Sequence, residues 1–374
     1  MADYFFYGTL CHPPQLTTLL GHPAAVEPAS LPGHSVWWAE GQPFPFIRPD
    51  AGGRAEGHLA RGLSEADAAR LDFYEGGLGY RLETLTVQGP TGPVPAKVWL
   101  PPPDVWAQGP EWNLADWVRD WFAIANATLA DVVAAQGTRP AAEVLRRYPQ
   151  MLVRGASRVR AMSETAPATL RRDAGPDDVR RVALHQPYAH FFAAEEYDLS
   201  HRRFDGTMSR VINRAAFVMA DAVTVLPYDP VRDRVLLIEQ FRAGPLARGD
   251  RNPWQIEAVA GRIDAGETPE AAARREAAEE AGLQLGALLH VRNYYPSPGA
   301  VTEFLYSYVA LTDLPDGVAG VFGVADEAED IRGHLVPFAR MMDLIASGEI
   351  ANAPLILTAL WLQRERPRLR AAAG

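Results

Sequence analysis

The chain has 374 residues, a formal net charge of −10 at pH 7 and 48% hydrophobic residues. This length predicts two or three domains with full hydrophobic cores, and the negative charge argues against binding to nucleic acid or to an anionic membrane. The single cysteine, Cys11, excludes an intramolecular disulfide, and no apolar run is long enough to span a membrane or to act as a signal peptide. We therefore expect a cytoplasmic protein.

The first candidate element is residues 4–10, with the sequence YFFYGTL. An apolar run without alternation is typical of a central strand that is buried on both faces. Further along, residues 71–76 read LDFYEG and contain the acid Glu75. YGTL alone is a weak signal, because four residues of strand and turn occur widely.

Paired with LDFYEG, however, YGTL resembles the gamma-glutamylcyclotransferase-like family over about residues 3 to 103. The resemblance implies a small mixed β-barrel in which Glu75 is the acid and base for cyclisation to 5-oxoproline. The family's loop binds the gamma-glutamyl group through backbone groups, and the matching residues here are Tyr7, Gly8, Thr9 and Leu10. Because a fold can keep a site without its chemistry, a binding or packing role for this domain is the alternative.

The middle of the chain predicts helices and a linker. Three prolines at 101–103 cannot continue a central strand and end the first domain. Apolar residues at helical spacing predict one helix over 112–135 and another over 141–152, and residues 164–178 have the composition of a linker. We therefore expect three parts: a domain over 1–105, a helical connector and linker over 106–175, and a second domain over 176–374.

The second domain contains two early strand candidates. Residues 235–238 form a continuous apolar run, which predicts a fully buried strand, and residues 255–259 predict a second short strand. Near the end, residues 355–362 begin a helix. The basic run at 364–370 is interpreted as the solvated end of that helix rather than as a nucleic-acid site.

The most informative stretch is residues 261–283, which read GRIDAGETPEAAARREAAEEAGL. Thr268 is a good N-cap, and Pro269 suits the first helical position. The residues that follow are strong helix formers. Gly282 suits the left-handed residue that ends a helix. The stretch therefore predicts a loop followed by a well-capped helix.

Three acids of this helix share one face, because they are three or four residues apart: Glu276, Glu279 and Glu280. Their repulsion is relieved when a hard divalent cation binds them, and carboxylate oxygens suit Mg²⁺, with Mn²⁺ as a substitute. The alternative is an ordinary acidic helix face. The preceding loop with its paired glycines, residues 261–267, argues against that alternative.

The polar positions of the stretch resemble the Nudix box, the signature of hydrolases that cleave a nucleoside diphosphate linked to another group. The matching residues are Gly261, Glu267, Arg275, Glu276, Glu279, Glu280 and Gly282. The sequences EQFR at 239–242, PWQIEAVAG at 253–261 and SPG at 297–299 are similar to the ADP-ribose pyrophosphatase branch, and the resemblance covers about residues 180 to 370. It implies a mixed sheet sandwiched by helices, so that the expected fold class is α+β with an α/β/α second domain.

The same resemblance implies roles for individual residues. The metal ligands would be Glu276, Glu279, Glu280 and the backbone carbonyl of Ala260. Arg275 and Glu267 match an ion pair that orients these carboxylates. The acidic stretch at 324–331 is similar to the loop that supplies the general base; Glu327 matches that base, and Glu329 stays open as the alternative. The positions that contact substrate would be Arg242, Glu257, Pro298 and Glu303.

The expected function is Mg²⁺-dependent hydrolysis of ADP-ribose to AMP and ribose 5-phosphate, with Glu327, Glu280, Glu276 and Arg275 as catalytic residues. Two alternatives stay open: a sensor that binds ADP-ribose without cleaving it, and a bifunctional protein in which Glu75 also cyclises gamma-glutamyl amines. The resemblance implies a homodimer through the Nudix domain, and the pairing of the two domains is similar to bacterial tellurite-resistance proteins. The sequence leaves the preferred nucleotide sugar open.

Overall fold

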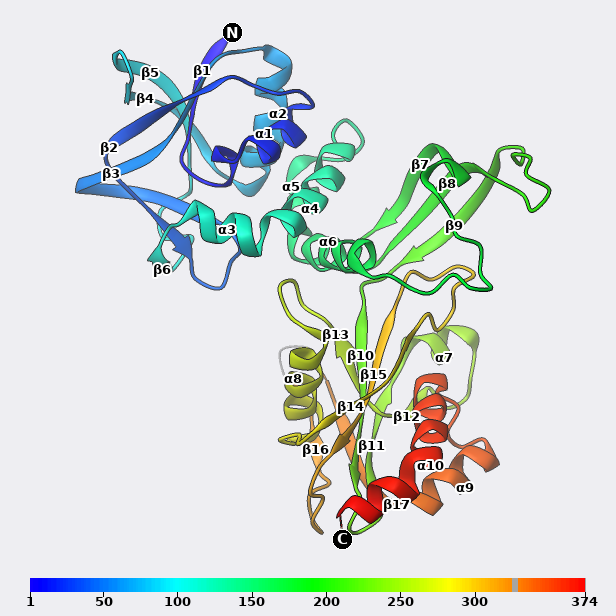
Figure 1. Ribbon diagram of the computed structural model, residues 1–374. Coiled ribbons are helices and arrows are strands. Elements are labelled where there is room, and N and C mark those ends of the chain that lie inside the picture. The colour runs from blue at the N-terminus through cyan, green and yellow to red at the C-terminus, as the bar shows by residue number, and fades with distance from the viewer. Residues whose placement is uncertain (325–328, 374) are drawn as a thin grey trace. The chain divides into compact units, whose positions relative to one another are not determined.

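The computed structural model describes residues 1–324 and 329–373. The chain divides into two compact units, Met1–Ala166 and Pro167–Gly374, and Figure 1 shows the elements of each. The division falls inside the segment 106–175 that the sequence predicts to be a connector. Each unit has a hydrophobic core of its own.

The first unit is built on a closed mixed barrel. The strand order is β3-β1-β5-β4-β2-β6, and a further pairing of β2 with β3 closes the ring. β1 runs parallel to β5, and the other neighbours are antiparallel. Phe5, Leu59 and Val98 are among the side chains that fill the interior. The strands are β1 (Ala2–Phe6), β2 (Val26–Ala39), β3 (Pro45–Leu63), β4 (Arg81–Gly89), β5 (Gly92–Leu100) and β6 (Gln108–Glu111).

The helices of the first unit follow from local signals. Ser64 and Asp67 form a reciprocal capping box that starts α2, and this helix ends at Glu75. β1 ends at Phe6, so the YGTL loop leaves the sheet and turns into the 3₁₀ helix η1. The helices are η1 (Thr9–Cys11), α1 (Pro13–Leu20), α2 (Glu65–Glu75), η2 (Gly76–Leu78), α3 (Leu114–Asp120), α4 (Phe122–Ala134), α5 (Ala141–Leu145) and α6 (Tyr148–Ser163).

Both helices predicted for the middle of the chain are interrupted. The segment 112–135 forms α3 and α4, with a break at Trp121, whose φ of −125° and ψ of −23° are not helical. The segment 141–152 forms α5 and the start of α6, because Pro149 has no N–H to donate and instead occupies the first turn of a new helix. The spacing of apolar residues predicted the helical segments but did not predict these breaks.

The second unit contains a mixed sheet of eight strands and a separate sheet of three. The path through the large sheet is β14-β15-β10-β11-β17-β16, with β12 paired to β11 and β13 paired to β10. β10 and β15 are parallel, and both are almost entirely buried. The strands are β7 (Val179–Ala189), β8 (Ala193–His201), β9 (Ile212–Val218), β10 (Ala222–Asp229), β11 (Arg234–Phe241), β12 (Trp254–Glu257), β13 (Val259–Arg262), β14 (Leu288–Tyr294), β15 (Leu305–Leu311), β16 (Val321–Phe322) and β17 (Ile331–Pro337).

Helices cover the large sheet on both faces (Figure 1). The alanines of α8 pack on one face against Val223 and Ile238, and α9 and α10 pack on the other face against Leu226 and Leu237. This is the expected α/β/α arrangement. The helices of this unit are η3 (Pro176–Asp178), α7 (Ala243–Arg248), α8 (Pro269–Ala281), α9 (Phe338–Ser347) and α10 (Ala353–Ala373).

The predicted ends of α8 are confirmed. The Thr268 hydroxyl accepts a hydrogen bond from the N–H of Ala271 at 3.2 Å, and Pro269 is the first helical residue. Gly282 ends the helix with a φ of +64°, a conformation that favours glycine.

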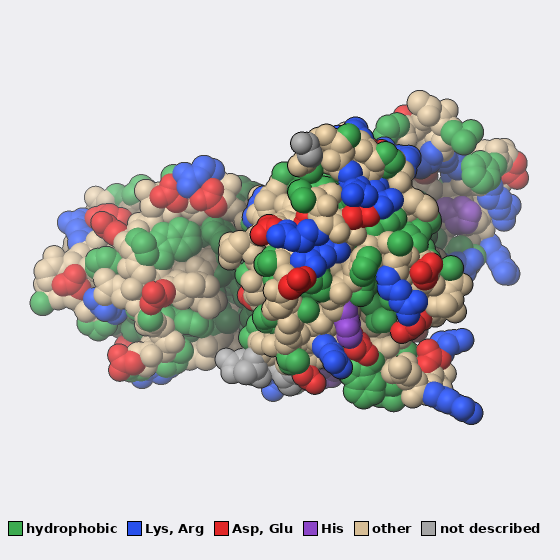
Figure 2. Space-filling model, turned by 90° about the horizontal axis from the view of Figure 1, so that it is seen from below, with side chains coloured by type: hydrophobic (Ala, Val, Ile, Leu, Met, Phe, Trp, Pro, Cys, Tyr) green, Lys and Arg blue, Asp and Glu red, His purple; other side chains and the backbone are tan. Residues whose placement is uncertain are grey.

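Two other predictions need correction. The strand expected over 255–259 is two strands, because the chain leaves β11 after Glu257 and pairs with β10 from Val259 onwards. The basic end of α10 is not simply solvated: Arg366 and Arg370 both donate to the carboxylate of Asp233. On the face shown in Figure 2, acidic and basic side chains likewise lie close together, so their charges offset each other locally.

The small sheet orders its strands β7-β8-β9, and Phe217 of β9 forms an isolated bridge with Val301 in the loop between β14 and β15. Hydrophobic side chains along β7 are solvent-exposed, among them Val179 and Val182. Within the described residues, no helix has the length and apolarity that a membrane-spanning helix needs.

Candidate functional site

The helix α8 presents three glutamates toward the strand β13. Glu280 is almost fully buried, and its Oε2 accepts a hydrogen bond of 3.0 Å from the N–H of Ala260. Glu276 is largely buried and Glu279 is partly exposed. The structure thus brings the three predicted carboxylates and Ala260 into one place, because α8 packs directly on β13.

Glycine at position 261 is required by this close packing. A Cβ added to Gly261 would lie 1.9 Å from Oε1 of Glu276 and 2.0 Å from its Cδ. Any larger residue would therefore push the Glu276 carboxylate away. The first glycine of the box keeps the space into which that carboxylate fits.

Arg275 organises the cluster through its planar guanidinium. Nε and Nη2 each donate to one oxygen of Glu267 at 3.1 Å, which is a bidentate pair. Nη1 donates to Glu276 at 2.8 Å and to Glu279 at 2.9 Å, and Nη2 also reaches the carbonyl of Arg262 at 3.0 Å. Burial opposes the charge of Arg275, but these hydrogen bonds and the neighbouring acids raise its pKa. The predicted orienting role of Arg275 and Glu267 agrees with this geometry.

The two most buried glutamates of the cluster, Glu276 and Glu280, resist ionisation in this structure. Burial raises the pKa of Glu276 to about 7, against the lowering effect of Arg275, and Glu279 raises it further. Burial raises the pKa of Glu280 to about 8, against the hydrogen bond from Ala260. A nearby cation would reverse this balance, because it favours the charged form of each carboxylate.

The chemistry of this donor set fits a hard divalent cation. It offers carboxylate oxygens in a buried, mutually repelling cluster, and Gly261 leaves room beside them. Within residues 1–324 and 329–373, no three acidic, histidine or cysteine side chains are arranged to chelate an ion as they stand. In the structure, Ala260 donates to one oxygen of Glu280, and Arg275 donates to one oxygen each of Glu276 and Glu279.

Arg242 and Glu257 form an ion pair at the ends of β11 and β12. Arg242 donates from Nε at 2.9 Å and from Nη2 at 2.7 Å, both to Oε2 of Glu257. Glu257 is buried, whereas the arginine side chain is 41% exposed. Gln240, near the end of β11, donates to both Glu257 and Glu280 at 3.4 Å. The predicted substrate contacts thus adjoin the carboxylate cluster.

The loop after β14 contributes Glu303. Burial raises the pKa of Glu303, Arg242 lowers it and Asp221 raises it, so this acid lies within electrostatic reach of the arginine. Pro298 is exposed in a turn in which the N–H of Val301 donates to Ser297 at 3.1 Å. Ala300 accepts a hydrogen bond from Phe217 at 2.7 Å, which ties the turn to β9.

The predicted general base, Glu327, lies outside the described residues. The alternative, Glu329, is described and accepts a hydrogen bond of 3.2 Å from the N–H of Val324. Its charge raises the pKa of both Glu276 and Glu280. Glu329 is therefore within electrostatic reach of the cluster.

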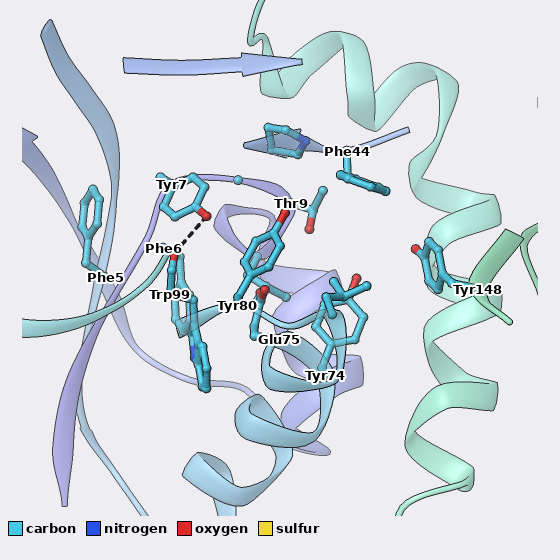
Figure 3. Close-up of a pocket in the computed structure, with 14 residues that line it drawn as sticks. Phe5, Phe6, Tyr7, Thr9, Phe44, Tyr74, Glu75, Tyr80, Trp99 and Tyr148 are labelled. Carbon is cyan, nitrogen blue, oxygen red and sulfur yellow. Dashed lines mark hydrogen bonds between the residues drawn. The ribbon is translucent and has the colours of Figure 1, made fainter. Parts of the chain in front are cut away.

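A second candidate site lies in the first unit (Figure 3). It is a cavity of about 50 Å³ between the YGTL loop and the end of α2. The residues singled out in the sequence all line it: Tyr7, Gly8, Thr9, Leu10 and Glu75. Gly8 is needed here, since an added Cβ would lie 2.8 Å from Cγ of Pro45.

Aromatic side chains enclose Glu75. Figure 3 shows it beside Tyr74 and Tyr80, with Tyr148 approaching from α6. Burial raises the pKa of the Glu75 carboxyl to about 7. The Tyr7 hydroxyl is held by a 2.9 Å hydrogen bond to the carbonyl of Trp99. A carboxyl that exchanges its proton near neutral pH is suited to acid and base catalysis.

Comparison with known proteins agrees with this geometry. The NUDIX domain model matches residues 219–357. The ADP-ribose pyrophosphatase of Escherichia coli (strain K12) is 39% identical over 196 residues, which cover 52% of this chain and 93% of that protein. The chain belongs to the Nudix family. The ADP-ribose pyrophosphatase of Haemophilus influenzae is 34% identical and is covered to 89%, with 52% of this chain. The GDP-mannose pyrophosphatase of Salmonella paratyphi B is 33% identical and is covered to 84%, with 45% of this chain.

The first unit of this Nudix protein matches a second family model. The model described as "Gamma-glutamyl cyclotransferase, AIG2-like" covers residues 4–119. It includes the YGTL loop and Glu75 but ends before α5 and α6. Tyr148, which lines the cavity, therefore comes from a part of this chain that the model does not cover.

Sequence reasoning missed several residues of both sites. In the Nudix unit, Asn352 donates to Glu257 at 2.9 Å, and Gln240 lies between Glu257 and Glu280. In the first unit, the missed cavity residues include Phe44, Tyr74, Tyr80, Trp99 and Tyr148. An asparagine before Ala-Pro could have been identified as a helix cap. Its contact with a strand 95 positions away has no local sequence signal.

Proposed function

We propose that the Nudix unit hydrolyses the diphosphate of ADP-ribose, giving AMP and ribose 5-phosphate. The observation that carries this proposal is the carboxylate cluster of α8, organised by Arg275 and adjoining the ion pair of Arg242 with Glu257. Relatives named ADP-ribose pyrophosphatase support the choice of substrate, since they match nearly their full length.

The reaction is a displacement at phosphorus. The oxygen of a water molecule forms a bond to one phosphorus of the diphosphate, and the bond from that phosphorus to the bridging oxygen breaks. Glu327 takes the proton of the water, with Glu329 as the alternative base. Glu276, Glu279, Glu280 and the carbonyl of Ala260 would hold the metal, which when bound would neutralise the diphosphate and stabilise the charge of the displacement. Arg242 and Glu303 contact the substrate, with Glu303 toward the terminal ribose.

The finer points of the proposal concern the metal, the assembly and the setting. Mg²⁺ is the physiological ion and Mn²⁺ a substitute, because both suit carboxylate oxygens. The exposed hydrophobic side chains of β7 support a homodimer through the Nudix unit. We place the protein in the cytoplasm. The pairing of the two domains suggests a role connected with tellurite resistance.

The experiment that tests the proposal compares the wild type with Glu280→Gln. We expect kcat for ADP-ribose to fall by about 100-fold or more, with the dissociation constant for ADP-ribose changed only a few-fold. Exposed Glu349→Gln is the matched control and should keep full activity. Equal turnover in Glu280→Gln and wild type would contradict the mechanism. Wild-type binding of ADP-ribose without any cleavage would favour the sensor alternative.

A second activity is favoured by the cavity around Glu75. There the α-amine of a gamma-glutamyl amine would attack the γ-carbonyl carbon, forming 5-oxoproline as the bond to the leaving amine breaks. Glu75 would take a proton from the attacking amine and return it to the leaving one. Release of 5-oxoproline that is abolished in Glu75→Gln would support this function, and no release from any gamma-glutamyl amine would leave the unit with a binding or packing role.

A further inference from the structure

Asn352 joins the start of α10 to the substrate side of the Nudix site. Its backbone carbonyl and its Oδ1 accept hydrogen bonds from Ile356 at 3.0 Å and from Leu355 at 2.9 Å, so it caps this helix. Its Nδ2 points elsewhere and donates to Oε1 of Glu257 at 2.9 Å. One side chain thus caps a helix and also holds a buried carboxylate.

The two carboxylate oxygens of Glu257 accept hydrogen bonds from different residues. Oε1 accepts from Asn352, and Oε2 accepts from Nε and Nη2 of Arg242 and, at 3.4 Å, from Gln240. The Glu257 residue is only 6% exposed, so water cannot replace a lost donor easily. With Oε1 held by Asn352, the carboxylate plane is fixed and Oε2 stays directed at the guanidinium.

Arg242 in turn keeps part of its guanidinium available. Among the described residues, its Nη1 donates to no protein group, while its Nε and Nη2 are engaged by Glu257. A guanidinium held on one edge presents its other edge in a fixed direction, which is what binding of a phosphate oxygen needs. The orientation of that edge depends on Glu257, and the orientation of Glu257 depends on Asn352.

We propose that Asn352 is a positioning residue for substrate: by holding Oε1 of Glu257 it fixes the direction in which Arg242 meets the diphosphate. The inference rests on the proposed function of the Nudix unit. It assigns part of the binding site to the helix cap of α10, an element on the opposite face of the sheet from the catalytic helix α8. Asn352 does not touch the reacting atoms, so its loss should weaken binding more than it slows the chemical step.

The decisive variant is Asn352→Asp. Aspartate has the same shape and caps helices as well as asparagine, so α10 is retained. It replaces the Nδ2 donor by an oxygen that repels Glu257. We expect the dissociation constant for ADP-ribose, measured by calorimetry in EDTA, to rise about tenfold, which is the loss of one hydrogen bond to a charged group. KM in Mg²⁺ should rise similarly, with kcat within about threefold.

A matched control and a rescue separate positioning from stability. Asn113 caps α3 in the same way, through Oδ1, in the first unit, so Asn113→Asp should leave both constants unchanged. The double variant Asn352→Asp with Glu257→Gln exchanges the amide and the carboxylate between the two positions. The new amide at position 257 would donate to the new carboxylate at position 352 and still offer an oxygen to Arg242. We expect the double variant to bind ADP-ribose more tightly than Asn352→Asp alone.

The outcomes distinguish this inference from the proposed function. An unchanged dissociation constant in Asn352→Asp, or a loss of affinity that simply follows a fall in melting temperature, would overturn the positioning role. If the wild type binds ADP-ribose but does not cleave it in Mg²⁺, the proposed function fails, and a tenfold loss of binding in Asn352→Asp still supports positioning. A wild type that neither binds nor cleaves overturns both.

Discussion

Arg275 and Gly261 together explain why the box has its spacing. One arginine contacts three acids: Glu267 of the loop, and Glu276 and Glu279 within one turn of α8. Gly261 leaves the volume in which Glu276 lies. Helical periodicity alone predicts that Glu276, Glu279 and Glu280 share one face, whereas the orienting role of Arg275 was implied by the resemblance to the Nudix box.

Gly261→Ala tests this packing. The added Cβ would displace the end of a flexible side chain, so the fold should survive with little change in melting temperature. The displaced Glu276 carboxylate should raise the metal concentration for half-maximal activity by about 10–100-fold. A Mg²⁺ titration of activity measures this. The control is Gly175→Ala, where no described group outside its chain neighbours lies within 4 Å of an added Cβ; equal titrations for both variants would contradict the argument.

Glu75 should make the stability of the first unit depend on pH. Its pKa in the folded state is raised by burial to about 7, above its ordinary value of 4.5. The protonated form therefore stabilises the fold fully below pH 4.5, and this contribution is lost as the pH rises through 7. Relative to wild type, Glu75→Gln should gain several degrees in melting temperature at pH 8 and little at pH 4.5, at roughly 2–4 °C per kcal/mol. A constant difference across the pH range would show that Glu75 is not buried as described.

Other residues could not be predicted from the sequence. Asn352 and Glu257 are 95 positions apart, and only the packing of α10 against the sheet brings them together. Tyr148 reaches the cavity because α6 folds back on the barrel unit, and nothing in its local sequence indicates this. Glu327, the residue with the most important inferred role, lies outside the described residues and stays a prediction.

At the scale of elements, local sequence signals predicted the ends of helices better than they predicted breaks within helices and strands. The caps of α8 and the buried strand β11 follow directly from residue types. The break at Trp121 does not, because the helical spacing of apolar residues continues through it. The switch of partners between β12 and β13 is equally hidden, since one extended segment pairs with two different strands.

The small sheet β7-β8-β9 gives a prediction about assembly. Val182 on its edge strand β7 is 57% exposed, and a charge there should prevent two hydrophobic faces from meeting. Light scattering should give the mass of a dimer for the wild type and of a monomer for Val182→Glu. Val231→Glu, at a loop residue that is 67% exposed, should stay dimeric. A monomeric wild type, or a Val182→Glu variant that still dimerises, would exclude this surface.

At the scale of the whole molecule, the chain joins two units that each have a core and a candidate site. The E. coli relative, of which 93% is covered, matches only 52% of this chain. Residues 167–374 alone should therefore fold and keep the ADP-ribose hydrolysis of the full chain within a few-fold. Circular dichroism and an assay of AMP release would check this, and a folded but inactive fragment would mean that the first unit contributes to the Nudix site.

The central claim is metal-dependent cleavage of ADP-ribose by the carboxylate cluster of α8. The most direct measurement is release of phosphate monoesters from a panel of nucleoside diphosphate sugars, including ADP-ribose and GDP-mannose, in Mg²⁺ and in EDTA. We predict the fastest cleavage for ADP-ribose in Mg²⁺ and none in EDTA. Cleavage that persists in EDTA, or cleavage of no substrate in Mg²⁺, would contradict the claim.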